Sequence, residues 1–220
     1  MAIDFMDARF TAPICTVRDV AELVGMPLTT VQSWAGQRHS RPQLITRIPP
    51  ERRGWPSIPL VGLAEAATLR GLLGILPRKE VWAAADWIRQ RFDTPHALAN
   101  EKLVTDGAYA YVEEHPNSIY RVATNQHVIR STVEEYLRPV RFAEDFYPEA
   151  FRVNQLPGVE INPHFNAGRM AFERNRVPVF AVAGSLRAGE TVAEVIEEYQ
   201  LTRAEVRAVE RQLDWLDEAA

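Results

Sequence analysis

A pair of short amphipathic segments between residues 16 and 36 constrains this chain more than any other feature of its sequence. Thr16 and Asp19 have the spacing of an N-cap and the acidic partner of a capping box. Apolar side chains then recur at i, i+3, i+4 and i+7, as on one face of a helix. Gly25 suits the left-handed residue that ends a helix, and Pro27 suits the start of the next. The segment therefore predicts two helices joined by a tight turn, which is the helix-turn-helix arrangement.

The second predicted helix carries short hydrogen-bonding side chains on its outward face, while Val31 is expected to face the first helix. In helix-turn-helix proteins the second helix enters the major groove, where such side chains reach base edges and phosphates. An ordinary helical hairpin has the same spacing, and the motif alone leaves that alternative open. The candidates for DNA contact on this helix are Thr29, Thr30, Gln32, Ser33 and Gln37.

Charge is segregated along the chain, although its net value is only −4. Residues 38–53 contain five arginines and one acid, whereas residues 190–220 contain nine acids and three arginines. Counted this way, the first segment suits phosphates and the second does not.

The segment 44–60 predicts a short irregular hairpin, which its prolines confine to an edge. A basic wing beside a recognition helix allows arginines to reach backbone phosphates or the minor groove. The alternative is a solvated charged loop. The basic candidates for DNA contact are Arg38, Arg47, Arg52 and Arg53.

The middle of the chain predicts further helices and a few short β elements. Leu60 and Pro77 each begin a helical apolar stripe, and Asp106-Gly107, between the apolar runs 102–106 and 108–112, predicts a hairpin. No internal repeat is found. Weaker patterns predict a loose arm, a short helix, a strand and a linker, at residues 1–13, 128–137, 151–155 and 157–158 respectively.

The C-terminal part predicts one strand followed by three packed helices. Val159 and Ile161 alternate with polar residues, as in a short strand, and residues 176–179 lead into a helix that ends near Gly184. Capping boxes then precede the last two helices, and their residue pairs are Thr191 with Glu194 and Thr202 with Glu205.

The predicted fold class is mainly α with small β elements. Three parts are expected: a winged helix-turn-helix N-terminal domain, a linking α/β segment, and a C-terminal three-helix domain that is itself helix-turn-helix-like. Their predicted bounds are 1–95, 96–157 and 158–220.

Residues 16–92 resemble the MerR-type winged helix-turn-helix. The resemblance lies in the runs Val17 to Met26, Thr30 to Trp34 and Ile58 to Glu65. The long antiparallel dimer helix and the cysteine-rich metal loop of the activating members have no counterpart here. The resemblance therefore implies DNA binding without effector-sensing activation.

Residues 159–216 resemble the family of domains of unknown function numbered 433. The runs that carry the resemblance are 161–163, 168–169, 176–179, 186–191, 195–199 and 201–202; Asn162 and the run 174–176 depart from the usual pattern. Together with the N-terminal part, this resembles a VapB-type antitoxin of a type II toxin–antitoxin pair. The resemblance implies two partners: operator DNA, where the chain represses its own operon, and a PIN-like ribonuclease toxin.

Four arginines are the candidates for contact with such a toxin. PIN-like nucleases hold Mg²⁺ with clustered carboxylates, and arginines can pair with these and mask the metal site. Alternatives are that the arginines only decorate the surface or cap helices, and that the acidic last helix meets a basic toxin surface. The four candidates are Arg169, Arg174, Arg176 and Arg187, which have Glu173 as the one acid among them.

No catalytic pattern emerges from the sequence. The five histidines are scattered without a metal-ligand spacing, Cys15 is the single cysteine, and no phosphate-binding loop or nucleophile elbow is present. We therefore expect no enzyme activity, no cofactor and no metal site. The sequence has no apolar run long enough to span a membrane and no signal peptide, so a cytoplasmic location is expected.

A homodimer is expected, because one recognition helix reads too few bases and two-fold symmetry matches palindromic operators. The antitoxin would also form a hetero-oligomer with its toxin. Two alternatives stay open: a stand-alone dimeric transcriptional regulator whose C-terminal domain serves dimerisation, and a regulator that senses a small molecule through its middle segment.

Overall fold

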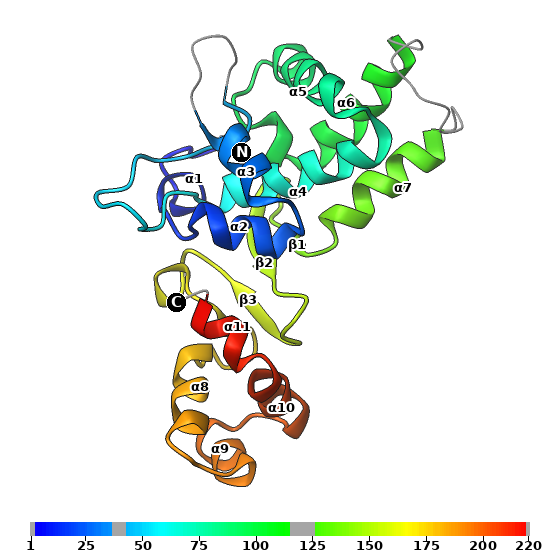
Figure 1. Cartoon of the computed structure of the whole chain (residues 1–220). Helices are drawn as coiled ribbons and strands as arrows, with labels where there is room; N and C mark the ends of the chain where they lie inside the picture. Colours follow the sequence, from blue (N-terminus) through cyan, green and yellow to red (C-terminus); the bar gives the residue numbers. More distant parts are fainter. Residues whose placement is uncertain (1–2, 37–42, 115–125, 219–220) are drawn as a thin grey trace. The chain divides into compact units, whose positions relative to one another are not determined.

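The computed structural model describes residues 3–36, 43–114 and 126–218, and these residues are mainly helical (Figure 1). The chain forms two compact units, Met1–Glu149 and Ala150–Ala220. The prediction of a mainly helical chain with small β elements is confirmed. Among the described residues, no helix is long and apolar enough to cross a membrane.

The first unit is built from helices with one short strand near its end. In chain order these are α1 (Ala8–Thr11), α2 (Val17–Val24), α3 (Leu28–Ala35), α4 (Leu60–Ile75), α5 (Arg78–Phe92), the 3₁₀ turn η1 (Ala97–Ala99), α6 (Glu101–Glu114), α7 (Gln126–Leu137) and β1 (Val140–Phe142). α4 is the core of this unit, because it is buried along almost its whole length and contacts α1, α2, α5, α7 and η1.

The predicted helix pair between residues 16 and 36 is confirmed. Thr16 and Asp19 form the complete capping box of α2. Gly25 adopts the left-handed conformation, with φ 65°, and its N–H donates to the carbonyl of Ala21. Val20 and Val31 are fully buried between the helices, so burial of these side chains fixes the pair.

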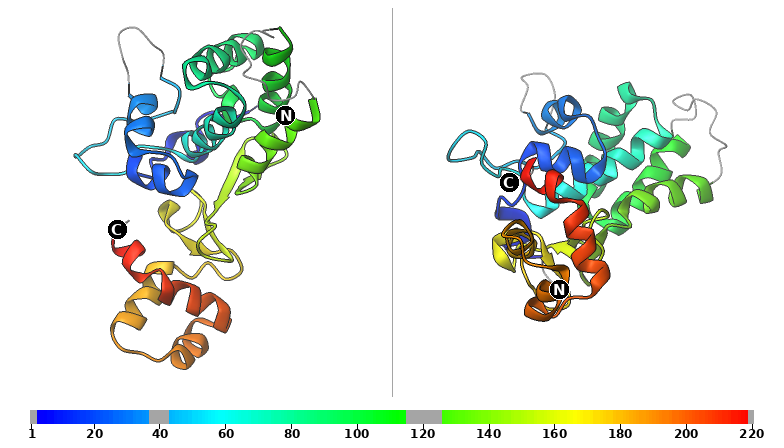
Figure 2. Two further views of the ribbon diagram at one scale, coloured as in Figure 1. Left: turned by 45° about the vertical axis from the view of Figure 1, so that its right-hand side comes forward. Right: turned by 60° about the horizontal axis from the view of Figure 1, so that its bottom comes forward.

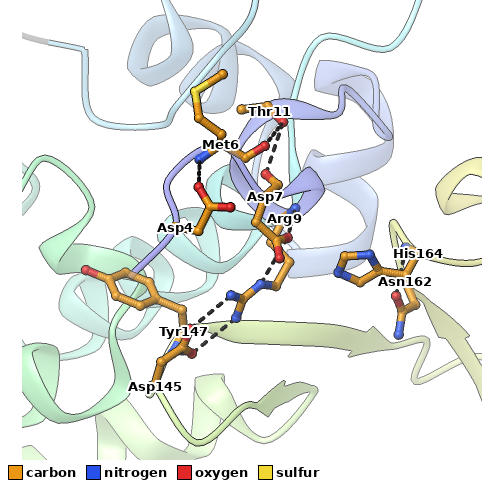
Figure 3. Close-up of polar contacts among 9 residues, drawn as sticks. All are labelled: Asp4, Met6, Asp7, Arg9, Thr11, Asp145, Tyr147, Asn162 and His164. Carbon is orange, nitrogen blue, oxygen red and sulfur yellow. Dashed lines mark hydrogen bonds and ion pairs between the residues drawn. The ribbon is translucent and has the colours of Figure 1, made fainter. Parts of the chain in front are cut away.

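The N-terminal segment is not the loose arm that its sequence predicts. Arg9 forms a bidentate ion pair with Asp145, in which Nη1–Oδ1 is 3.1 Å and Nη2–Oδ2 is 2.9 Å (Figure 3). Phe10 is buried, with its ring 5.2 Å from that of Tyr147. The segment carries no periodic signal because the side chains that hold it lie far along the chain.

The hairpin predicted at Asp106-Gly107 is wrong, because both apolar runs belong to one helix, α6. Gly107 faces α5 so closely that a Cβ there would lie 2.9 Å from Cε2 of Phe92 and 3.1 Å from Cγ1 of Ile88. The glycine therefore serves the close approach of two helices rather than a turn. The short helix predicted at 128–137 is confirmed as α7.

The second unit contains a small antiparallel sheet and a group of helices. Its elements are β2 (Pro148–Arg152), which contains the boundary between the units, β3 (Val159–Ile161), η3 (Asn166–Gly168), β4 (Ala171–Phe172), α8 (Val179–Arg187), α9 (Val192–Tyr199), α10 (Arg203–Arg211) and α11 (Leu213–Glu218). The strand order is β1-β2-β3-β4. Phe151 lies opposite Ile161, and Val159 lies opposite Phe172.

Three packed helices at the C-terminal end are confirmed as α8, α9 and α10, which group together in both views of Figure 2. Thr191 and Thr202 form the predicted capping boxes with Glu194 and Glu205. The helix predicted to end near Gly184 continues to Arg187.

Two boundaries predicted around residues 96–158 differ in the structure. Pro157-Gly158 is not a linker: Val153 N–H donates to the carbonyl of Val159 at 2.9 Å, so the dipeptide lies in the tight loop between β2 and β3. The predicted linking segment 96–157 is not a unit of its own. Residues 96–149 belong to the first unit and residues 150–157 to the second, and the strand expected at 151–155 lies at Pro148–Arg152.

Candidate nucleic-acid interface

The exposed face of α3 contains most, but not all, of the predicted contact residues. Thr29 and Gln32 are exposed and Ser33 is half-buried. Thr30 is only 2% exposed, so its predicted outward placement is wrong. Gln37 lies outside the described residues, as does Arg38.

Thr30 instead accepts a hydrogen bond that brings a further cation to this helix. Nη2 of Arg78, at the start of α5, donates to Oγ1 of Thr30 at 3.0 Å. Arg78 and Lys79 are both exposed in the first turn of α5. The helix dipole disfavours cations at a helix N-terminus. The position of Arg78 directly after Pro77, at the predicted start of a helix, is therefore the sequence signal that could have pointed to a contact with another element.

The segment after α3 is a loop with no regular strand among residues 43–57. Ile48 N–H donates to the carbonyl of Ser57 at 2.8 Å, and Cys15 and Ile58 form an isolated antiparallel bridge. This loop is irregular, as predicted, and it projects Arg47, Arg52 and Arg53 into solvent.

Within this loop, Arg52 lies 5.2 Å above the ring of Trp55, which is itself 48% exposed. None of Arg47, Arg52 and Arg53 has an ion pair with any of the described residues. The guanidinium groups are therefore available to an anionic partner, and stacking on an indole leaves the donors at the guanidinium edge free to bind phosphate oxygens.

A buried carboxylate anchors the base of the loop. Glu65 on α4 is 0% exposed, and its Oε2 accepts the backbone N–H of Thr46 at 2.5 Å. Its Oε1 lies 3.5 Å from Nη2 of Arg89, which also donates to the carbonyl of Leu44 at 2.7 Å. Oε1 is also 3.6 Å from Nδ1 of His96. The loop is thus tied to α4 and α5 by paired and hydrogen-bonded groups, as burial of a charge requires.

Two titratable groups near α2 are perturbed by burial. Burial raises the pKa of Asp19, although hydrogen bonds from Thr16 oppose this. Burial also raises the pKa of the Cys15 thiol, with a smaller contribution from the charge of Asp19. Cys15 therefore acts as a small apolar core residue, and the activation that its place before a helix could have given is absent.

The four arginines predicted to contact a toxin divide into two pairs. Arg174 donates to the carbonyl of Gln200 at 2.6 Å and lies 3.5 Å from Oε2 of Glu205, so it ties the end of α9 to α10. Arg187 donates to the carbonyl of Leu213 at 3.2 Å. These two contacts match the helix-capping alternative.

Arg169 and Arg176 lie on aromatic rings, of which Phe180 is exposed and Phe165 is half-buried. The guanidinium of Arg176 is 3.6 Å from the ring centroid of Phe165, and that of Arg169 is 5.7 Å from the ring of Phe180. Phe180 is 57% exposed. Neither guanidinium has a hydrogen bond or ion pair with the residues that the structure describes, so this surface combines exposed apolar area with unpaired positive charge.

The loop beneath these arginines is unusual in its backbone. Asn166, Ala167 and Gly168 have φ values of 49°, 52° and 75°, and Arg176 has φ 59°. Nδ2 of Asn166 donates to the carbonyl of Arg176 at 3.0 Å and holds the two positive-φ segments together. Non-glycine residues at positive φ cost free energy and gather at functional surfaces, so this conformation favours a binding role for the loop.

Metal-ligating groups do not gather in threes anywhere in the described parts of the chain. Asn162 and His164, drawn in Figure 3, form a local hydrogen bond: Oδ1 of the Asn162 side chain accepts the backbone N–H of His164 at 3.0 Å.

One family model matches the C-terminal part of this chain, and two matches to known proteins cover most of its length. Residues 159–210 match the model of a family described as "Protein of unknown function (DUF433)", which confirms the predicted resemblance of the C-terminal part. The crystal structure of Rv2018 from Mycobacterium tuberculosis has a TM-score of 0.73 and 27% identity, and the match covers 91% of this chain and 98% of that one. The chain is also similar to a Mycobacterium tuberculosis protein named "Putative antitoxin VapB45", with 27% identity over 226 residues. That match covers 92% of this chain and 94% of its relative.

Proposed function

We propose that this chain is the antitoxin of a type II toxin–antitoxin pair, in which the first unit represses the operon and the second binds the toxin. The observation that carries the proposal is the similarity to a protein named as an antitoxin, which extends over nearly the whole of both chains. Both units are therefore expected to share the relative's task.

The DNA-binding half rests on α3 and the loop that follows it. Gln32 and Thr29 present donors and acceptors of the kind that reads base edges, and Arg47, Arg52 and Arg53 present unpaired positive charge on the loop that follows α3. Arg78 adds a further cation through its hydrogen bond to Thr30 in the first turn of α3. This combination supports a winged helix-turn-helix that holds phosphates with the loop and reads bases with α3.

The test is DNA binding by the full-length chain to its own promoter fragment, measured by fluorescence anisotropy across a salt series. Arg52→Ala/Arg53→Ala should weaken binding to every sequence and reduce the salt slope by about two, since each lost phosphate contact removes about 0.9. The charge-matched control is Arg91→Ala/Arg138→Ala, because these exposed arginines lie at the ends of α5 and α7. Gln32→Ala should change base preference instead. Unchanged slopes in the loop variant would remove the loop from the proposed DNA interface.

The toxin-binding half rests on Arg169 and Arg176 with the rings of Phe180 and Phe165. A PIN-like ribonuclease presents clustered carboxylates, which arginines bind through paired hydrogen bonds. An exposed aromatic ring next to such an arginine supplies the apolar contact that interface anchors use. The arginines would mask the carboxylates that the nuclease needs for its metal.

Co-expression with the PIN-like nuclease that the proposal expects to be encoded beside this gene tests the second half. The two proteins should co-purify, and RNA cleavage should fall as the antitoxin is added. Arg169→Ala/Arg176→Ala should weaken inhibition at least about tenfold, which is the effect of losing one to two charged hydrogen bonds. Arg138→Ala/Arg152→Ala removes the same charge elsewhere and should inhibit normally. If the wild-type chain neither binds nor inhibits the nuclease, the stand-alone regulator is the better description.

A further inference from the structure

The second unit repeats the helix-turn-helix geometry of the first, at an offset of 175 residues. α9 has eight residues, like α2, and both begin at a threonine N-cap with a complete capping box. Gln200 occupies the place of Gly25 and is also left-handed, with φ 53°. The next residue donates its N–H to the equivalent carbonyl in each motif, Met26 to Ala21 and Leu201 to Ile196.

The buried positions of the two motifs also correspond. Val195 stands where Val20 stands and Val206 where Val31 stands, and all four side chains are fully buried. Leu201, like Met26, is buried in the turn. The two motifs share little more than caps and core positions, which explains why no repeat is evident in the sequence. α10 is therefore the structural equivalent of α3.

The face of α10 that corresponds to the recognition face carries a stripe of arginines. Arg203, Arg207 and Arg211 follow one another at intervals of four residues and are all exposed. Side chains at this spacing lie along one side of a helix. Arg207 stands in the position of Gln32 on α3, and the intervening exposed residue is the small Ala204.

The acids on α10 do not cancel this stripe. Glu205 accepts the backbone N–H of Thr202 and pairs with Arg174, so it serves the cap of the helix. Glu210 pairs with Arg207 at 2.6 Å, in an exposed contact of a kind that contributes little and exchanges readily. Arg203 and Arg211 have no ion pair among the described residues. Residues 190–220 contain nine acids and only three arginines, but all three arginines lie on one face of α10.

We propose that α10 is a second DNA-binding helix, which grips the phosphate backbone of a duplex through Arg203, Arg207 and Arg211. Guanidinium groups bind phosphate oxygens through paired hydrogen bonds, so we assign phosphate contact to this face of α10 and base reading to the N-terminal motif. Each chain then holds DNA at two helix-turn-helix motifs. The protected stretch of promoter is accordingly longer than one motif covers.

The test compares full-length variants on the promoter fragment and on an unrelated duplex, across a salt series. Arg203→Ala/Arg207→Ala/Arg211→Ala should reduce the salt slope by about two to three on both duplexes, at about 0.9 for each lost contact. Arg91→Ala/Arg138→Ala/Arg152→Ala changes the net charge equally and should keep the slope. Lysine at the three α10 positions keeps the positive charge, so the lysine variant should also keep the salt slope. Alanine is a good helix former, so circular dichroism should show α10 intact.

Failure of this inference can be told apart from failure of the proposed function. If the loop variant at Arg52 and Arg53 lowers the slope and the α10 variant does not, the second DNA contact is overturned. If the α10 variant instead loses nuclease binding and keeps its DNA slope, α10 is a protein surface and the inference is also overturned. If only the α10 variant affects DNA, the inference stands and the N-terminal interface fails.

Discussion

Single side chains decide two features of this molecule that no local pattern announces. Arg9 meets Asp145 across 136 positions of sequence, and Arg78 meets Thr30 across 48. Neither pairing has a periodic signature, because an ion pair needs only two residues at the right point in space. The anchoring of the N-terminal segment and the contact of Arg78 with Thr30 therefore could not be predicted from a local pattern. Cys15, in contrast, lies directly before α2 and is a small buried core residue.

The Arg9–Asp145 pair should make stability depend on pH. Burial alone would raise the pKa of Asp145, but the hydrogen bond from Arg9, the backbone N–H of Tyr147 and the charge of Arg9 together outweigh it and lower the pKa. A lowered folded-state pKa stabilises the fold above the ordinary carboxyl range, and this stabilisation is lost as pH falls through the folded value. Asp145→Asn should therefore cost about 1–2 kcal/mol at pH 7 and progressively less in acid.

Urea unfolding of wild type and variant between pH 7 and pH 3 measures this difference. Asp4→Asn is the control, because the side chain of Asp4 is exposed and, among the described residues, accepts a hydrogen bond only from the nearby N–H of Met6. A difference between wild type and Asp145→Asn that stays constant down to pH 3 would contradict the assignment.

At the scale of elements, short-range chemistry specified most helices. All three capping boxes predicted from threonine and acid spacing are present, and Gly25 ends α2 as expected. The failure at Asp106-Gly107 shows the limit of this reasoning. The dipeptide has the composition of a tight turn, but burial of α6 against α5 stabilises the helix and makes the small residue necessary for contact.

Two glycine substitutions should therefore change stability in opposite directions. At Gly107 a new Cβ would lie 2.9 Å from Phe92, so Gly107→Ala should destabilise by about 1–3 kcal/mol despite the better helix propensity of alanine. At Gly184, inside α8, no atom lies within 4 Å of a new Cβ, so Gly184→Ala should stabilise by about 0.5–1 kcal/mol. Thermal unfolding followed by circular dichroism gives the sign of each change; a stabilised Gly107→Ala would refute the packing argument.

At the scale of the whole molecule, charge and symmetry bear on function. The chain is acidic overall, with a net charge of −4, yet exposed arginines gather on the loop 47–53 and on α10. Net charge therefore says little about what such a chain binds, because partners meet local surfaces. Likewise, the arginines at 169 and 176 are distinguished from those at 174 and 187 only by what each one touches.

We expect the chain to be a homodimer when bound to its promoter. One recognition helix contacts too few base pairs for useful specificity, and a two-fold axis would place two copies of α3 about one helical turn of DNA apart. Sedimentation velocity should give a particle of twice the 24.9 kDa chain mass at micromolar concentration. A single-chain mass both free and on DNA would rule out a symmetric operator complex.

The sequence by itself determined the helix pair at 16–36, the capped helices of the C-terminal end and the predominance of helix, because caps, turns and apolar stripes act over a few residues. Only the tertiary structure decided that Thr30 is buried, that residues 101–114 are one helix, and which arginines have hydrogen-bond or ion-pair partners. The same holds for the match between α10 and α3, because the expected helix-turn-helix-like character of the C-terminal domain did not show which positions of the two motifs correspond. These outcomes depend on which distant surfaces meet, and burial and ion pairing across long sequence separations leave no trace in a local pattern.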